Sequence, residues 1–165
     1  MKKLYTMLLL VISLCTASCS DWLDVSPSNQ VNGDKLFEIG DGYRNALNGI
    51  YLNLGTSSMY GQTMSWGFMD AIAQYYKTDN GSNFIPKTSA YYKSAKFQFE
   101  DSDVKTFISN IWSVSYNNIA NCNNLILNVS EASPSVFKEG EFEKNMIWGE
   151  ALALRAFMHF DLLRL

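Results

Sequence analysis

Apolar residues recur at three- and four-residue spacings in two long stretches of the second half of the chain. This spacing aligns apolar side chains on one face of an α-helix, so it predicts two amphipathic helices, over about 103–129 and from about 138 to the end. The inward positions predicted for the first are Val104, Ile108, Ile111, Ser115, Ile119, Cys122, Ile126 and Val129, with Phe107, Trp112 and Tyr116 widening the stripe. Those predicted for the second are Phe142, Ile147, Ala151, Leu154, Phe157 and Leu163.

These two helices, joined by about ten residues, are expected to form an antiparallel hairpin. Small side chains such as Ala151 let the helices approach closely, and Trp112, Tyr116, Phe157 and Phe160 are expected to fill the remaining space. The hairpin has the character of a tetratricopeptide-type unit, without a second copy of that repeat. The predicted fold class is all-α with long irregular loops. The last helix stops at Leu165 without a terminating residue, so we expect a longer protein to continue it.

The first half of the chain is less regular. A helix is predicted over 34–54, with Asp34 as N-cap, Gly55 as the stop and an apolar stripe that includes Ile39 and Tyr51. Three glycines within it predict irregular first turns. A shorter helix is predicted over 64–76, and residues 90–99 alternate weakly enough to suggest an extended segment. Residues 56–63 and 77–89 have loop composition.

The chain begins with the pattern of an export signal. Lys2 and Lys3 precede an apolar run over 4–14, which is too short to span a bilayer, and small residues then lead to Cys19. Residues 1–18 resemble a lipoprotein signal peptide, with Cys19 as the lipidated residue, although Thr16 stands where leucine is usual. The alternative is an ordinary cleaved signal peptide followed by a stray cysteine.

Three segments are therefore expected: a signal peptide over 1–18, a lipidated acidic tether over 19–33, and a helical domain over 34–165. The tether begins Cys-Ser-Asp-Trp-Leu-Asp and lacks basic residues at that point. It resembles the acidic export tag of Bacteroidetes lipoproteins that reach the outer face of the outer membrane. We expect a lipid-anchored protein that faces outward.

Charge and cysteine content narrow the possible functions. Removing residues 1–18 takes away two of 13 basic side chains and none of 16 acidic ones, which leaves a net charge of about −5. A chain this acidic is not expected to bind nucleic acid. With Cys19 acylated, Cys122 is the one cysteine left in the mature chain, so no internal disulfide framework is possible.

The residues give little support for catalysis. Glu100, Asp101 and Asp103 cluster directly before a predicted helix, where acidic residues favour the positive end of the helix dipole, so they are interpreted as capping residues. Ser102 or Asp103 can serve as the N-cap. His159 is the single histidine of the sequence, and no metal-binding constellation is expected around it. We expect no enzyme activity, no metal and no cofactor.

The aromatic residues between the first and third predicted helices suggest a binding surface. Sugar rings pack on tryptophan and tyrosine faces, while carboxylates and amides satisfy their hydroxyls. The candidate ligand-binding residues are Trp66, Asp70, Tyr75 and Tyr76. The alternative is that Trp66 and Tyr75 belong to the core.

Three segments resemble, in order, the SusD/RagB family of Bacteroidetes surface lipoproteins. They are the lipidated start at 19–27, the Ile-Trp and Asn-rich helix over 111–126, and the Gly-Glu-Ala-Leu-Ala-Leu-Arg-Ala-Phe run within 149–165. The resemblance implies a mostly helical protein that captures glycans, or in some members peptides, and partners a TonB-dependent, SusC-like outer-membrane transporter. It implies no catalysis. The competing hypothesis is a lipid-anchored helical scaffold for protein–protein interaction without a small ligand.

Overall fold

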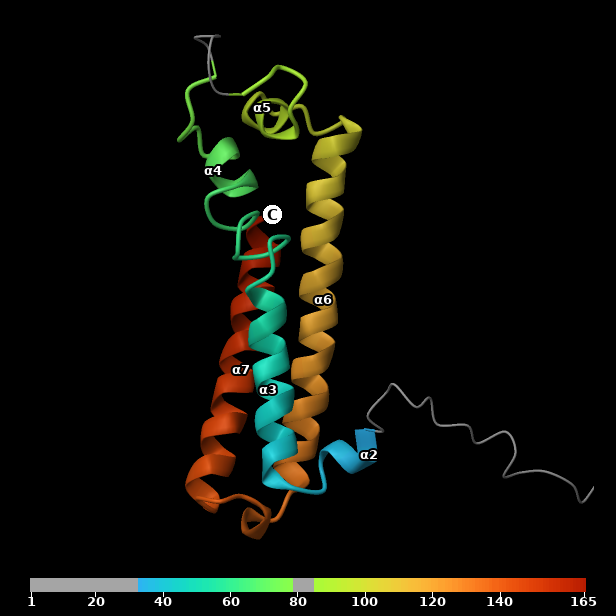
Figure 1. Ribbon diagram of the computed structural model, residues 1–165, viewed down its shortest axis with the longest axis vertical. Helices are drawn as coiled ribbons and strands as arrows, with labels where there is room; N and C mark the ends of the chain where they lie inside the picture. Colours follow the sequence, from blue (N-terminus) through green and yellow to red (C-terminus); the bar gives the residue numbers. More distant parts are fainter. Residues whose placement is uncertain (1–32, 79–84) are drawn as a thin grey trace, which may run out of the picture. The chain divides into compact units, whose positions relative to one another are not determined.

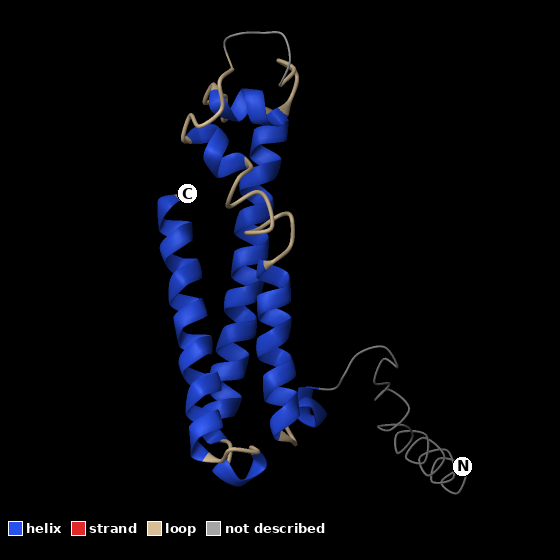
Figure 2. Ribbon diagram, turned by 60° about the vertical axis from the view of Figure 1, so that its left-hand side comes forward, coloured by secondary structure: helices blue, strands red, loops and turns tan. Residues whose placement is uncertain are grey.

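Two long helices, α6 (Ser102–Glu131) and α7 (Glu141–Arg164), run antiparallel and form the predicted hairpin (Figure 1). The turn between them contains the short 3₁₀ helix η1 (Pro134–Val136). The computed structural model describes residues 33–78 and 85–165, and in these ranges every regular element is helical (Figure 2). The expected all-α class is thus confirmed.

The N-cap of α6 is Asp101, one of the three acidic residues expected to cap this helix. The Asp101 carboxylate, not the side chain of Ser102 or Asp103, accepts the backbone N–H of Asp103 at 2.9 Å. An N-cap carboxylate satisfies one of the first N–H groups of a helix, which otherwise lack intrahelical partners.

Helix α3 (Gly40–Leu54) packs against both helices of the hairpin and completes a three-helix bundle. Its buried apolar stripe faces one continuous core shared with α6 and α7. That core contains Tyr43, Leu47, Ile50, Leu54, Met59, Ile119, Cys122, Leu125, Val129, Phe137, Ile147, Ala151 and Met158.

The helix expected over 34–54 is interrupted. A four-residue helix, α2 (Gly33–Leu36), ends before α3, whose N-cap is Ile39 and not Asp34. A Cβ on Gly42 would lie 1.5 Å from the Leu36 carbonyl oxygen, so the sharp turn needs a glycine there. The break between α2 and α3 changes which residues of the predicted helix face the core. Ile39 and Tyr51, which were predicted to face inward, are exposed.

A second, smaller core forms where two short helices meet the first turns of α6. Phe68 of helix α4 (Phe68–Ile72) packs with Val104 and Ile111 of α6 in this core. Helix α5 (Ala90–Ala95) reaches its edge through Tyr91, whose ring stacks on Phe107. The helix expected over 64–76 is therefore much shorter, and the extended segment expected over 90–99 is wrong. The Ser89 hydroxyl accepts the N–H of Tyr91 and starts a helix there instead.

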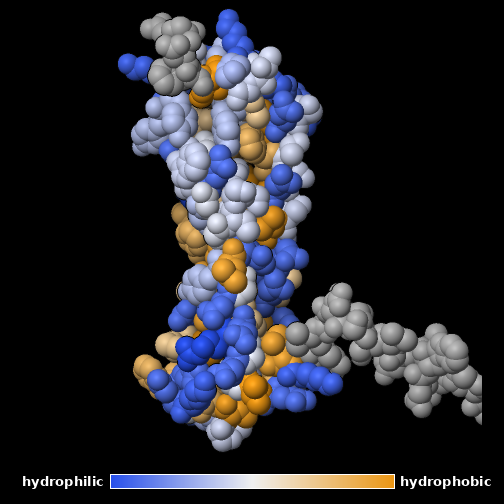
Figure 3. Space-filling model, in the orientation of Figure 1, coloured by the Kyte–Doolittle hydropathy of each residue, from blue (hydrophilic) through white to orange (hydrophobic). Residues whose placement is uncertain are grey.

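The inward stripe of α7 differs from the prediction. Glu143 and Asp161 take buried positions on it because each has a partner: Glu143 pairs with Arg44, and Asp161 binds Tyr60 and Arg164. Ile147 and Ala151 are buried as predicted. Six other apolar residues that were expected inside or between the helices are exposed instead. Apolar patches are visible on the surface (Figure 3). These exposed residues are Trp112, Tyr116, Phe142, Phe157, Phe160 and Leu163.

Residues 36–165 form one compact unit. The signal peptide expected over 1–18, the lipidation site Cys19 and nearly all of the tether expected over 19–33 lie outside the described residues. Among residues 33–78 and 85–165, no helix combines the length and the apolar composition that a membrane span requires.

Candidate functional site

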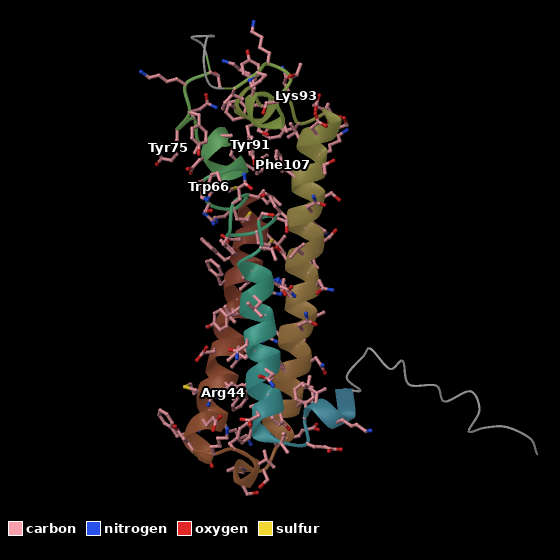
Figure 4. All side chains as sticks on the ribbon, viewed as in Figure 1. Arg44, Trp66, Tyr75, Tyr91, Lys93 and Phe107 are labelled. Atoms are coloured by element: carbon pink, nitrogen blue, oxygen red, sulfur yellow. The ribbon has the colours of Figure 1, made fainter. Side chains whose placement is uncertain are left out.

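The candidate ligand-binding residues lie in the irregular segments around α4 and α5. Figure 4 shows Trp66, Tyr75 and Tyr91 near one end of α6, whereas Arg44 lies towards the other end. The face that they form is called the loop face below and consists of residues 56–78 and 85–101.

Close backbone turns build the start of the loop face. The N–H of Gly67 donates to the Gln62 carbonyl at 2.8 Å, and the N–H of Gly61 donates to the Thr56 carbonyl at 3.0 Å. A Cβ on Gly61 would lie 2.4 Å from a backbone oxygen, so a side chain there would force the turn open. The glycines therefore let the chain fold back on itself and place Trp66 on the outside of the turn.

Three of the four predicted ligand residues are brought together. Trp66 is 58% exposed and Tyr75 is 78% exposed, so the alternative that these two rings are core residues is wrong. The Tyr76 hydroxyl donates to the backbone carbonyl of Trp66 and ties the segment after α4 to the turn before it. Exposed rings held on a fixed backbone are suited to stack against a flat apolar face.

Asp70 belongs to the same segment but has a different setting. It lies half-buried in α4, and its backbone carbonyl accepts the N–H of Tyr75 at 3.0 Å. Through this bond Asp70 helps to fix the backbone that carries Tyr75.

Gln74 was not among the four candidate residues, yet it precedes Tyr75 and has an unusual backbone conformation. Its φ of 63° lies in the left-handed region, which few residues other than glycine adopt. The side-chain Nε2 donates to the Ala95 carbonyl at 2.7 Å and thereby joins the end of α4 to α5. Such backbone strain persists only where neighbouring contacts enforce it, and it is concentrated at functional sites.

A second group, whose members were not among the four candidates, lies between the turn and α6. Gln62 Nε2 donates to the Tyr91 hydroxyl at 2.9 Å, and the Tyr91 ring stacks on Phe107 with centroids 5.2 Å apart. Phe107 in turn contacts the buried Phe68 ring. These residues are far apart in sequence, and no local spacing pattern predicts that they meet.

Charged side chains fasten the loop face to α6. The Lys93 ammonium lies 2.7 Å from Asp103 and 3.0 Å from Asp101. The two carboxylates raise the pKa of Lys93, with Asp103 the larger cause, and Lys93 in turn lowers the pKa of Asp101. The ion pairs join α5 to the first turn of α6.

The described residues offer little for covalent or metal chemistry. Within residues 33–78 and 85–165, no three His, Cys, Asp or Glu side chains are grouped so as to hold a metal ion. Burial raises the pKa of the Cys122 thiol, which disfavours the reactive thiolate. What the loop face offers is exposed aromatic rings with amides and hydroxyls nearby, the composition of a binding surface.

Comparison with known proteins identifies the family. The family model SusD-like_3, described as "Starch-binding associating with outer membrane", matches residues 21–165. No curated protein and no solved structure shows significant similarity to the chain. The match covers the bundle and the loop face together, and the chain therefore belongs to the SusD-like family of proteins associated with the outer membrane.

Proposed function

We propose that this protein captures glycans at the bacterial surface and presents them to a TonB-dependent, SusC-like outer-membrane transporter. The family description supports a starch-like glycan as the ligand. The observation that carries the proposal is the pair of exposed rings, Trp66 and Tyr75, fixed on one segment by Tyr76 and Gln74.

In this proposal the rings of Trp66 and Tyr75 stack on sugar faces, and Asp70 and Tyr76 contribute polar groups beside them. Lipid on Cys19 anchors the protein to the outer membrane, and the protein faces outward. The protein carries out no chemistry on the glycan. Its task is to raise the local concentration of the glycan at the transporter.

Titration calorimetry with single variants tests the stacking surface. Trp66→Ala and Tyr75→Ala should each weaken binding of maltoheptaose about threefold to tenfold, because an aromatic contact contributes ~0.5–1.5 kcal/mol. Melting temperatures should hardly change, since both rings are exposed, whereas a buried ring truncated to alanine costs ~3–5 kcal/mol of folding stability.

Phe142→Ala is the matched control, because Phe142 is also exposed but lies at the start of α7. It should bind like the wild type. If both loop-face variants also bind like the wild type, these rings do not contact the ligand. Absence of binding by the wild type to every glycan of a broad panel would favour the protein-binding scaffold, for which the exposed apolar residues of α7 would be the docking surface.

A further inference from the structure

A small cavity opens between the turn before α4, the start of α5 and the second and third turns of α6. Its volume is about 220 Å³. Its principal lining residues are Ser57, Ser58, Gln62, Tyr91, Phe107 and Asn110. Sites for drug-sized ligands measure roughly 300–1,000 Å³, so this cavity suits a single small ring better than a chain of them.

The cavity is rigid on its aromatic side. Tyr91 is held at its hydroxyl by Gln62 and on its ring face by Phe107, which rests on the smaller core. Because Gln62 donates to the Tyr91 oxygen, the hydroxyl hydrogen of Tyr91 and the Oε1 of Gln62 both remain available to a ligand. A donor and an acceptor thus lie side by side in a fixed geometry.

The opposite side adds unpaired polar groups. The side chain of Asn110 makes no hydrogen bond to any residue in the described ranges, and it can both donate and accept. The backbone carbonyl of Ser57 is already occupied by Thr63, whose hydroxyl donates to it at 2.7 Å, which fixes the wall that carries the Ser57 hydroxyl.

None of the residues that line the cavity carries a formal charge. Ligands with carboxylate, sulfate or phosphate groups would lose water there without gaining a cationic partner. Alternating donors and acceptors beside an aromatic wall match the hydroxyls and C–H faces of a neutral sugar.

We propose that this cavity is a subsite for one neutral pyranose unit, and that it selects neutral glycans against uronate-containing ones. The inference rests on the proposed glycan-binding function. It adds a position apart from the exposed Trp66 and Tyr75 rings and names the class of sugar. The backbone bond from Gly67 to Gln62 links the two positions, because Gln62 lines the cavity and Trp66 precedes Gly67.

Calorimetry on three purified variants tests this subsite. Tyr91→Phe removes the hydroxyl and keeps the ring stacked on Phe107, and Asn110→Ala removes an exposed amide. Asn117→Ala is the control, because it removes an exposed asparagine of the same helix outside the cavity. The probes are neutral maltoheptaose, xylohexaose and mannohexaose, and acidic trigalacturonate.

With whichever neutral probe binds best, Tyr91→Phe and Asn110→Ala should each weaken binding about threefold to tenfold, the range of one uncharged hydrogen bond. Asn117→Ala should bind like the wild type, and all three should melt at the wild-type temperature. The factor by which each variant weakens binding should be the same with the corresponding disaccharide, since the cavity holds one ring. Trigalacturonate should bind at least about tenfold more weakly than the neutral probe.

If Trp66→Ala weakens binding while Tyr91→Phe and Asn110→Ala match the control, the subsite is wrong and the proposed function stands. Equal affinity for trigalacturonate overturns the selectivity. If the wild type binds none of the neutral probes, the proposed function and the subsite fail together. If Tyr91→Phe has a lower melting temperature than the wild type, the affinity of Asn110→Ala alone tests the subsite, because the Asn110 side chain is exposed.

Discussion

Glu143 is a buried carboxylate that stays charged because two elements supply its partners. Its side chain accepts the backbone N–H of Glu139 at 3.1 Å and pairs with Arg44 of α3. These interactions, the backbone hydrogen bond first, lower the pKa of Glu143 below its ordinary value of 4.5. One side chain thus ties the residue before the N-cap of α7 to the first turn of the helix and joins α7 to α3.

The lowered pKa predicts how stability depends on pH. The unfolded chain binds the Glu143 proton more tightly than the folded chain, so the contribution of this group is complete above about pH 4.5 and is lost as the pH falls towards the folded-state pKa. Glu143→Gln should therefore melt below the wild type at pH 7, and the gap should narrow at pH 3. Thermal melts by circular dichroism check this. A gap that is constant across the pH range would contradict a role for the charge.

Two glycines in the same helix illustrate how much backbone context matters. A Cβ on Gly49 would meet no atom within 4 Å, whereas a Cβ on Gly42 would collide with the Leu36 carbonyl. The first glycine costs α3 helix propensity without a compensating contact. The second is required by the turn that separates α2 from α3.

Gly49→Ala should therefore stabilise the protein by about 0.5–1 kcal/mol. Gly42→Ala should destabilise it by about 1–3 kcal/mol, since the backbone must move to admit the methyl group. Urea unfolding of both variants beside the wild type measures these differences. If the two substitutions have the same sign, the break between α2 and α3 is not enforced by this contact.

At the scale of elements, long helices were predictable and short ones were not. Three- and four-residue spacing repeats many times in α6, so one misplaced residue changes little. The six residues of α5 contain less than two full turns, and what makes them helical is the Ser89 cap and the tertiary ties of Lys93. These contacts are local in sequence, but the spacing of apolar residues carries no information about a hydroxyl cap or an ion pair.

The error in α7 has a different physical cause. Hydrophobicity alone favoured Phe157 and Leu163 as core residues, but the stripe that faces α3 and α6 includes Glu143 and Asp161. A charged residue is buried only where a partner satisfies it. Here the partners are Arg44 and Tyr60, which lie about a hundred positions earlier in the chain. The likeness of the hairpin to a tetratricopeptide unit stays a prediction.

In the candidate site, too, residues that are close in sequence could be predicted together, and contacts between distant segments could not. The aromatic composition of residues 60–76 was enough to single out Trp66, Tyr75 and Tyr76, because they are near one another in sequence and in space. The cavity beside them was missed, since Gln62, Tyr91 and Phe107 meet only through the packing of α4 and α5 on α6.

At the scale of the whole molecule, attachment to the membrane is expected to depend on one residue. Lipid chains bind bilayers through ~0.8 kcal/mol for each buried methylene, and more than one chain is needed for stable anchoring. Cys19→Ala should move the protein from the membrane fraction to the soluble fraction and abolish labelling with a radioactive fatty acid. Cys15→Ala is the matched control and should change neither. Persistent membrane association of Cys19→Ala would contradict lipidation at this residue.

Residues 33–78 and 85–165 form two cores along α6, a large one in the bundle and a small one beneath the loop face. Regions with few buried contacts open locally at lower free energy than the rest of a domain. Amide hydrogens of α4 and α5 should therefore exchange with deuterium much faster than those of the α6 segment 119–129. A bound glycan should slow exchange in α4 and α5 and leave the bundle unchanged, which mass spectrometry of peptic fragments can resolve. Uniform exchange along α6 and the loop face would mean that both cores open together, and the ligand would then stabilise the entire domain instead of the surface that it touches.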